Sequence, residues 1–225
     1  MKKIIILSIA VLFSGILSAQ PQFIKNIKKG TPQTLVVYGS SISTQGNGIY
    51  WVKTVDSIIN SKYNNKLTVY NSGVSGRSSA WAVEALKDSV LPKKPDAVIL
   101  EFATTDAVDR FDISPEQSRR YMDYLVDRIK EENPKAEVIL LLVSSHLIGE
   151  AAAKRSDLEA YNNMYRELAK DKKILLIDIT PETKKLVERG GEKELRKYQH
   201  DGVHLTKYGA TNLVAREVLK AFKIK

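Results

Sequence analysis

Residues 34–41 read Thr-Leu-Val-Val-Tyr-Gly-Ser-Ser, an apolar run that ends in a glycine and two serines. Such a nearly continuous run is typical of a strand whose two faces are both covered by helices. Four later runs have the same character, at residues 67–70, 96–102, 137–143 and 174–179. Stretches with apolar residues at helical spacing separate these runs, so we predict a three-layer α/β fold with a parallel sheet.

The clearest helix start lies in the middle of the chain. Ser114 is placed to cap it, Pro115 falls in the first turn and Gln117 occupies the capping-box position. We expect the helix that follows to bury Tyr121 and Ile129. Further helices are predicted over residues 48–62, 78–90, 158–168, from 180 onward, and 206–222.

Polar clusters follow four of the predicted strands at the points where they end. The clusters are residues 39–41, 71–73, 103–106 and 144–146. Ligands of open parallel sheets bind beyond the carboxyl ends of the strands. We therefore expect a functional site at this edge of the sheet.

Three histidines limit the choice of a catalytic base: His146, His200 and His204. A serine hydroxyl becomes a nucleophile when a base lies within hydrogen-bond reach and a partner orients that base. Asp201 and His204 flank Gly202 on one turn, so the carboxylate can hold Nδ1 and leave Nε2 free. Taken alone, this spacing is common, and a single serine at a strand end is usually an ordinary turn residue.

Four segments taken together resemble the sequence blocks of SGNH/GDSL hydrolases. Residues 39–42 are similar to the Gly-Asp-Ser-Leu block, residues 71–76 to the second block, 100–106 to the third and 201–204 to the fifth. They occur in the family's order, and the resemblance spans about residues 31–222. It implies a flavodoxin-like SGNH fold with five parallel strands and a serine hydrolase that needs no cofactor.

The resemblance also implies roles for individual residues. Ser41 would be the nucleophile, and Asp201 and His204 would complete the triad. The backbone N–H groups of Ser41 and Gly76, together with Thr105, would form the oxyanion hole. We expect hydrolysis of acyl esters, with O-acetyl groups on carbohydrate as the preferred substrate. The alternatives are a lipase, thioesterase or arylesterase of the same fold, or a catalytically weak glycan-binding domain.

Two blocks depart from the family pattern. Ser40 stands where the first block has Asp, which is not the triad carboxylate. In the third block, Ala103 replaces Gly, and Thr105 replaces the Asn that donates to the oxyanion. Losing one such donor costs about 2.7–4 kcal/mol of transition-state stabilisation. We therefore expect weakened activity or a locally rearranged oxyanion hole.

Three residues near these blocks are candidates for substrate binding: Arg77, Asp106 and His146. Arg77 suits an anionic group, although an exposed cation is more often simply solvated. Asp106 keeps the family's identity and is also expected to hold its loop. For His146, a functional role, as a substrate contact or as a replacement donor for the missing Asn, and an ordinary polar loop position are equally supported. The histidines lack metal-site spacing, so we expect no metal.

The first twenty residues have the pattern of a secretory signal peptide. Lys2 and Lys3 precede an apolar run over residues 4–13, which is short for a membrane span, and small residues precede Gln20. An uncleaved anchor is the alternative. We predict removal of residues 1–20, which leaves a single SGNH hydrolase domain at 21–225 in the periplasm or outside the cell. The sequence has no cysteine, so a lipid anchor on cysteine and disulfides are both excluded.

Composition suits one globular domain: 225 residues, 43% hydrophobic and 27% charged. The net charge is +9, but basic residues are scattered among acidic ones, which argues against nucleic-acid binding. The expected partner is a small-molecule or polysaccharide ester substrate, with no nucleic acid and no membrane after signal removal. The pattern leaves the oligomeric state open.

Overall fold

The computed structural model describes residues 19–44 and 46–225. The predicted signal peptide lies outside the described residues, apart from Ala19 and Gln20. Among the helices of the described part, none is both long and apolar enough to span a bilayer. The fold is thus that of the segment predicted to remain after processing.

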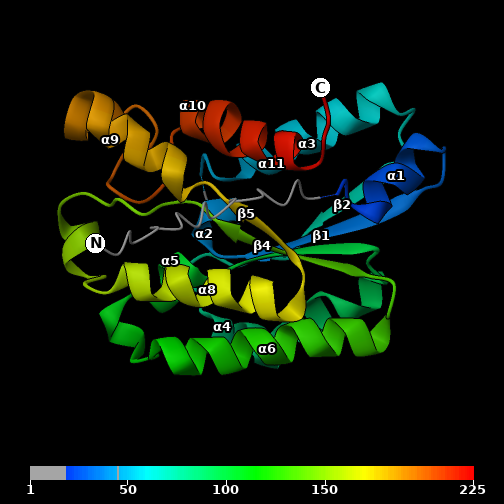
Figure 1. The fold of residues 1–225 in the computed structure, drawn as a ribbon, viewed down its shortest axis with the longest axis horizontal. Coiled ribbons are helices and arrows are strands. Elements are labelled where there is room, and N and C mark those ends of the chain that lie inside the picture. Colours follow the sequence, from blue (N-terminus) through cyan, green and yellow to red (C-terminus); the bar gives the residue numbers. More distant parts are fainter. Residues whose placement is uncertain (1–18, 45) are drawn as a thin grey trace, which may run out of the picture.

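A five-stranded, all-parallel sheet forms the middle layer (Figure 1). Its strands are β1 (Gln33–Gly39), β2 (Leu67–Asn71), β3 (Ala97–Glu101), β4 (Glu137–Leu142) and β5 (Leu175–Asp178). They lie in the order β2-β1-β3-β4-β5. This confirms the predicted three-layer α/β fold with a parallel sheet, and the order is the flavodoxin-like one.

Helices cover both faces of the sheet (Figure 1). One face carries α1 (Gln22–Lys28), α3 (Ile49–Lys62), α9 (Thr180–Leu195), α10 (Lys207–Gly209) and α11 (Arg216–Ala221), and the other carries α4 (Ser79–Ser89), α6 (Pro115–Glu132) and α8 (Leu158–Lys172). Alternate residues of β1 enter two cores, Leu35 and Val37 one, Val36 and Tyr38 the other. Because both faces of the inner strands are buried, β1, β3 and β4 are nearly unbroken apolar runs, whereas the edge strand β2 is mostly exposed.

The start of α6 has the predicted geometry. Ser114 Oγ accepts a hydrogen bond from the Gln117 N–H at 3.3 Å, and Gln117 Oε1 accepts one from the Ser114 N–H at 2.7 Å. These bonds satisfy two donors near the start of the helix. The buried face differs at one position. Tyr121 is only partly buried. The buried residues of α6 are Ser118, Met122, Leu125, Val126 and Ile129.

Three features of the helices were not predicted from the sequence. α1 precedes β1, and its Phe23 packs edge-on against Phe222 near the C-terminus, with ring centroids 5.1 Å apart. Gly190 and Gly191 leave helical geometry and kink α9. A π-helical turn, Ala210–Ala215, joins α10 to α11. None of these changes the order of the strands.

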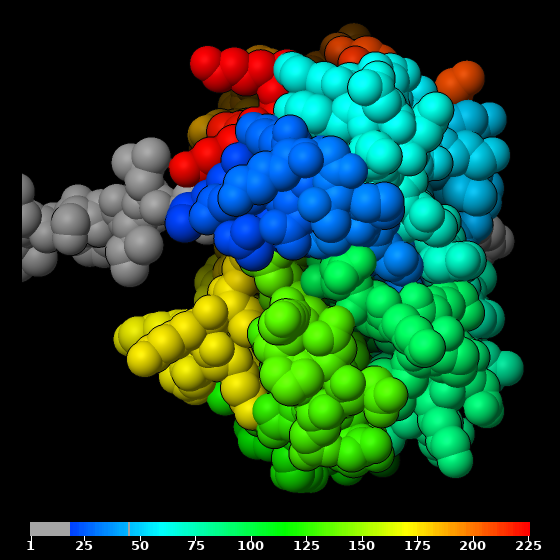
Figure 2. Space-filling model, turned by 90° about the vertical axis from the view of Figure 1, so that its right-hand side faces the viewer, coloured from blue at the N-terminus to red at the C-terminus, as the bar shows by residue number. Residues whose placement is uncertain are grey.

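Figure 2 looks onto the edge of the sheet where the strands begin, and α1 (blue) lies over part of it. The N–H groups of Gln22 and Phe23 donate to the carboxylate of Glu137, at the start of β4, at 2.8 and 2.6 Å. A carboxylate at a helix N-terminus is electrostatically favourable. These bonds attach α1 to the start of β4, and the polar clusters predicted from the sequence gather at the opposite edge.

Candidate active site

Ser41 is separated from the end of β1 only by Ser40, and it is the first residue of the one-turn helix α2 (Ser41–Thr44). β1 has β2 on one side and β3 on the other, so the strand order reverses here, at the point where ligands of open parallel sheets bind. Gly73, which follows β2, packs closely against this point. A Cβ on Gly73 would lie 2.5 Å from the carbonyl oxygen of Gly39. A side chain at position 73 would therefore collide with the last residue of β1, just before Ser41.

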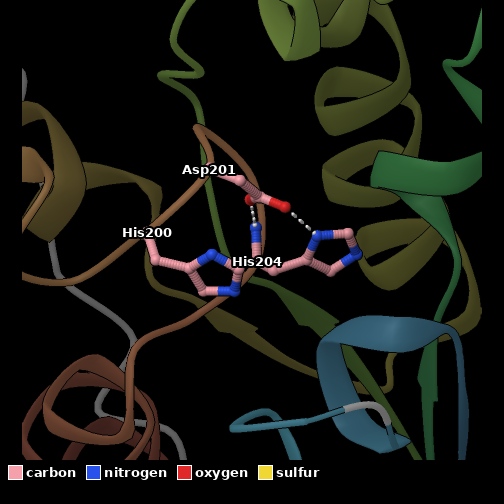
Figure 3. A group of neighbouring side chains, drawn as sticks. All are labelled: His200, Asp201 and His204. Atoms are coloured by element: carbon pink, nitrogen blue, oxygen red, sulfur yellow. Dashed lines mark hydrogen bonds and ion pairs between the residues drawn. The ribbon is translucent and has the colours of Figure 1, made fainter.

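A tight loop brings Asp201 and His204 to Ser41. The loop is held by the N–H of His200, which donates to the carbonyl oxygen of His204 at 2.9 Å. Nε2 of His204 lies 2.9 Å from Ser41 Oγ. Nδ1 of the same ring lies 2.6 Å from Oδ2 of Asp201 (Figure 3). The three residues predicted as a triad thus form one chain of hydrogen bonds.

Both carboxylate oxygens of Asp201 orient the imidazole. Oδ1 accepts from the N–H groups of Val203 and His204 at 3.1 and 2.8 Å, while Oδ2 faces Nδ1. Partial burial raises the pKa of Asp201, but the hydrogen bonds from His204 and Val203 outweigh burial and lower it to about 2. An ionised carboxylate can only accept. The ring proton therefore belongs on Nδ1, which leaves Nε2 as an acceptor toward Ser41.

The residues predicted to form the oxyanion hole are Ser41, Gly76 and Thr105. The N–H groups of Ser41 and Gly76 have no acceptor among the residues that the structure describes. Gly76 has φ +70°, in the left-handed region that favours glycine. Thr105 is 7% exposed in the short helix α5 (Ala103–Asp106), and its N–H is taken by the carbonyl of Phe102 at 2.9 Å. Its hydroxyl is therefore its free donor.

Asp106 holds the loop that carries Thr105. Its side chain is 1% exposed and accepts three hydrogen bonds, from the N–H and hydroxyl of Ser79 at 2.8 and 2.6 Å and from the hydroxyl of Ser118 at 2.6 Å. Burial raises the pKa of Asp106, against the hydrogen bonds from Ser118 and Ser79. The carboxyl joins the loop to α4 and α6 and does not face solvent.

The other two substrate-binding candidates are not hydrogen-bonded to the triad. His146 is half-buried, and its Nδ1 lies 2.9 Å from Ser145 Oγ, which donates to the carbonyl oxygen of Thr180 at the start of α9. Arg77 is exposed and forms no ion pair with any described residue. Neither residue completes the hydrogen-bonded cluster around Ser41.

Sequence reasoning missed two residues beside the site. Glu101, the last residue of β3, is 1% exposed and lies beneath Ser40, with burial raising the pKa of its carboxyl to about 8. The sign of this residue in the sequence is an acidic side chain at the end of a predicted apolar strand. Arg155 donates from Nε to the Thr104 carbonyl oxygen at 2.7 Å and from Nη1 to that of Ala151 at 2.9 Å. Its partners are backbone carbonyls, which leave no mark in the sequence.

One group in the described part of the chain has the ligand types of a metal site. His200, Asp201 and His204 place donor atoms within 4.8 Å of one another, and the two imidazoles stack with centroids 6.0 Å apart (Figure 3). Both ring nitrogens of His204 already face protein groups, Asp201 and Ser41. A cation bound here would therefore compete with the hydrogen bonds of the cluster.

A serine, a histidine and a carboxylate linked in this way are the groups that hydrolases use to form an acyl-enzyme. The sequence matches the model of the GDSL-like lipase/acylhydrolase family over residues 37–211. The chain belongs to this family, as its resemblance to SGNH/GDSL hydrolases predicted, and is a carboxylic ester hydrolase. A search of curated proteins finds no match.

Solved structures of low sequence identity share the fold. A candidate GDSL-like lipase from Parabacteroides merdae is 16% identical, with a TM-score of 0.73 over 87% of this chain and 97% of that one. An alpha/beta hydrolase from the metagenome of Lake Arreo is 21% identical (TM-score 0.71, 86% and 96% covered). An acetylxylan esterase from Geobacillus stearothermophilus is 19% identical (TM-score 0.72, 87% and 96% covered). At these identities the likeness establishes the fold.

Proposed function

We propose that this hydrolase is a serine esterase in which Ser41 is the nucleophile, His204 the general base and Asp201 the residue that orients the base. The observation that carries the proposal is the run of hydrogen bonds, 2.6 Å from Asp201 to His204 and 2.9 Å from His204 to Ser41. It lies at the carboxyl edge of a parallel sheet, where ligands of such folds bind.

In the proposed reaction, Ser41 Oγ attacks the acyl carbonyl carbon while its proton passes to Nε2 of His204. The N–H groups of Ser41 and Gly76, with the Thr105 hydroxyl, donate to the oxyanion. Nε2 then gives its proton to the departing alcohol. A water molecule, deprotonated by the same nitrogen, releases the acyl group as an acid and restores the serine. Each proton taken is returned, so the cycle needs no cofactor.

The proposed substrates are O-acetyl groups on carbohydrate. The acetylxylan esterase of the same fold supports this choice.

A chain-length series tests the substrate. We expect the purified enzyme to release acetate from acetylated xylan, and its kcat/KM to fall from p-nitrophenyl acetate to butyrate to octanoate. A rate that rises with chain length would instead indicate a lipase. A third outcome would be that no substrate is turned over, that a fluorophosphonate does not label the protein, and that the protein binds the glycan. This outcome would indicate the catalytically weak glycan-binding domain, the alternative that Thr105 suggests.

We also propose that the enzyme is exported and acts in the periplasm or outside the cell, after loss of residues 1–20. The charged start and the short apolar run support this. Mass spectrometry of the protein from its cell of origin tests it, with a mature N-terminus at or near Pro21 expected. A membrane-bound product that retains Met1 or Lys2 would contradict it.

A further inference from the structure

Glu101 is a buried acid that the proposed reaction does not use. It ends β3, in register with Gly39 at the end of β1. Its side chain is 1% exposed. A Cβ on Gly39 would lie 2.9 Å from Oε2 of this acid. The carboxyl therefore fits against the backbone that leads into the nucleophile turn, residues 40–43, and fits only because position 39 is glycine.

The carboxyl of Glu101 contacts the nucleophile turn on both sides of Ser41. Oε2 lies 3.1 Å from the N–H and 3.1 Å from the hydroxyl of Ser40, and 3.4 Å from the hydroxyl of Ser43. Ser41 itself makes no hydrogen bond to the acid and remains paired with His204. Glu101 thus fixes the residues around the nucleophile and leaves the hydroxyl of the nucleophile free to react.

No cation in the described part of the chain pairs with this acid. None of the salt bridges among the described residues includes Glu101, and the titratable groups that face it are Asp106 on α5 and the phenol of Tyr165 on α8. Burial raises the pKa of Glu101 to about 8, against the hydrogen bonds from Ser40 and Ser43. Serine hydroxyls can donate or accept, so the same contacts serve a neutral carboxyl.

We propose that Glu101 is a positioning residue whose neutral carboxyl holds the nucleophile turn, and that loss of its proton sets the alkaline limit of the esterase. The first sequence block of the family has an Asp at the position of Ser40, so Glu101 supplies a carboxyl that this turn otherwise lacks. An anionic Glu101 would place negative charge at the N–H of Ser40, one residue from the nucleophile, and would oppose the oxyanion that develops in the transition state. The proposal rests on Ser41 being the nucleophile.

The pH dependence of Glu101→Gln tests the proposal, because glutamine keeps the shape and hydrogen bonds of the neutral acid. Initial rates on p-nitrophenyl acetate, corrected for spontaneous hydrolysis, would be measured from pH 6 to 10. We expect the wild-type kcat to decline with a midpoint near pH 8 and the Gln variant to lose this decline. Glu101→Ala is expected to lower kcat by about 10- to 100-fold with KM little changed, because the nucleophile is misplaced.

Control experiments distinguish a wrong role for Glu101 from unfolding of a variant and from a wrong assignment of the nucleophile. Glu132→Gln, at an exposed site on α6, should keep the wild-type profile, and circular dichroism verifies the fold of each variant at each pH. An alkaline decline that is unchanged in Glu101→Gln, or a kcat in Glu101→Ala within twofold of the wild type, would overturn the role of Glu101. Full activity of Ser41→Ala would instead overturn the proposed function on which it rests.

Discussion

Gly202 lies against the backbone of Ile148. The N–H of Ile148 donates to the carbonyl oxygen of Gly202 at 3.2 Å, and a Cβ on Gly202 would stand 2.3 Å from the carbonyl oxygen of Ile148. Gly202 also has φ +91°. The loop that carries Asp201 and His204 is thus held against the segment after β4, and any side chain at position 202 would push it away.

Gly202→Ala is therefore expected to damage both stability and catalysis. The unfavourable backbone conformation alone costs about 1–3 kcal/mol, and the clash with Ile148 adds to it. Gly191→Ala is the matched control, because Gly191 also has positive φ, but a Cβ added there would meet no atom within 4 Å. Thermal melts and kcat/KM should show the larger loss at position 202. Equal losses in the two variants would contradict the close packing.

Asp201→Asn should lower kcat by about 10⁴-fold while leaving the fold intact. The N–H groups of Val203 and His204 would hold the amide oxygen at the place of Oδ1, so the amide NH₂ would face Nδ1 of His204. The ring would then carry its proton on Nε2 and could not accept one from Ser41. Steady-state kinetics on p-nitrophenyl acetate measure the loss. The exposed Asp157→Asn serves as control, and a loss below tenfold at position 201 would speak against the orienting role.

Thr105 variants measure how far a hydroxyl substitutes for an amide donor. Thr105→Ala should lower kcat by up to about 10²-fold, because the hydroxyl that we propose as an oxyanion donor is lost. Thr105→Asn should match or exceed the wild type, because it restores a longer donor. KM should change little, since the donor acts on charge that develops in the transition state. If alanine and threonine give the same kcat, the hydroxyl takes no part.

Glu101→Gln should also change how stability depends on pH. Burial raises the pKa of Glu101 from 4.5 to about 8, so between these values the unfolded chain has lost a proton that the folded chain keeps. Unfolding is therefore favoured as pH rises through this window, by on the order of 1 kcal/mol per pH unit. The melting temperature of the Gln variant minus that of the wild type should increase from pH 5 to 8 and remain constant above pH 8. A constant difference would show that Glu101 does not titrate in this window.

The order and type of the main elements were predictable because burial on both faces leaves an unambiguous sequence pattern. The run ending at Gly39 and the run from 137 to 143 both form central strands. The capping box at Ser114 was equally readable, since it depends on residues three apart. Tyr121 is only partly buried, although Leu125 and Ile129 on the same side of α6 are buried, because the packing neighbours set the depth of each position.

The residues of the hydrogen-bonded cluster were named from the sequence, but the residues that hold the neighbouring backbone in place were not. Spacing alone placed Asp201 and His204 on one turn, and the block order brought Ser41 to them. Glu101 and Arg155 could not be assigned in this way. Their partners, the turn beside Ser40 and the Thr104 carbonyl oxygen, meet them only once the strands are aligned.

The central claim concerns the hydroxyl of one serine, and active-site labelling tests it most directly. The enzyme would be treated with a fluorophosphonate probe near neutral pH, digested, and the modified peptide sequenced by mass spectrometry. The mechanism predicts a single adduct on Ser41, absent in Ser41→Ala and strongly slowed in a variant of His204. A label on another serine, or full esterase activity in Ser41→Ala, would contradict it.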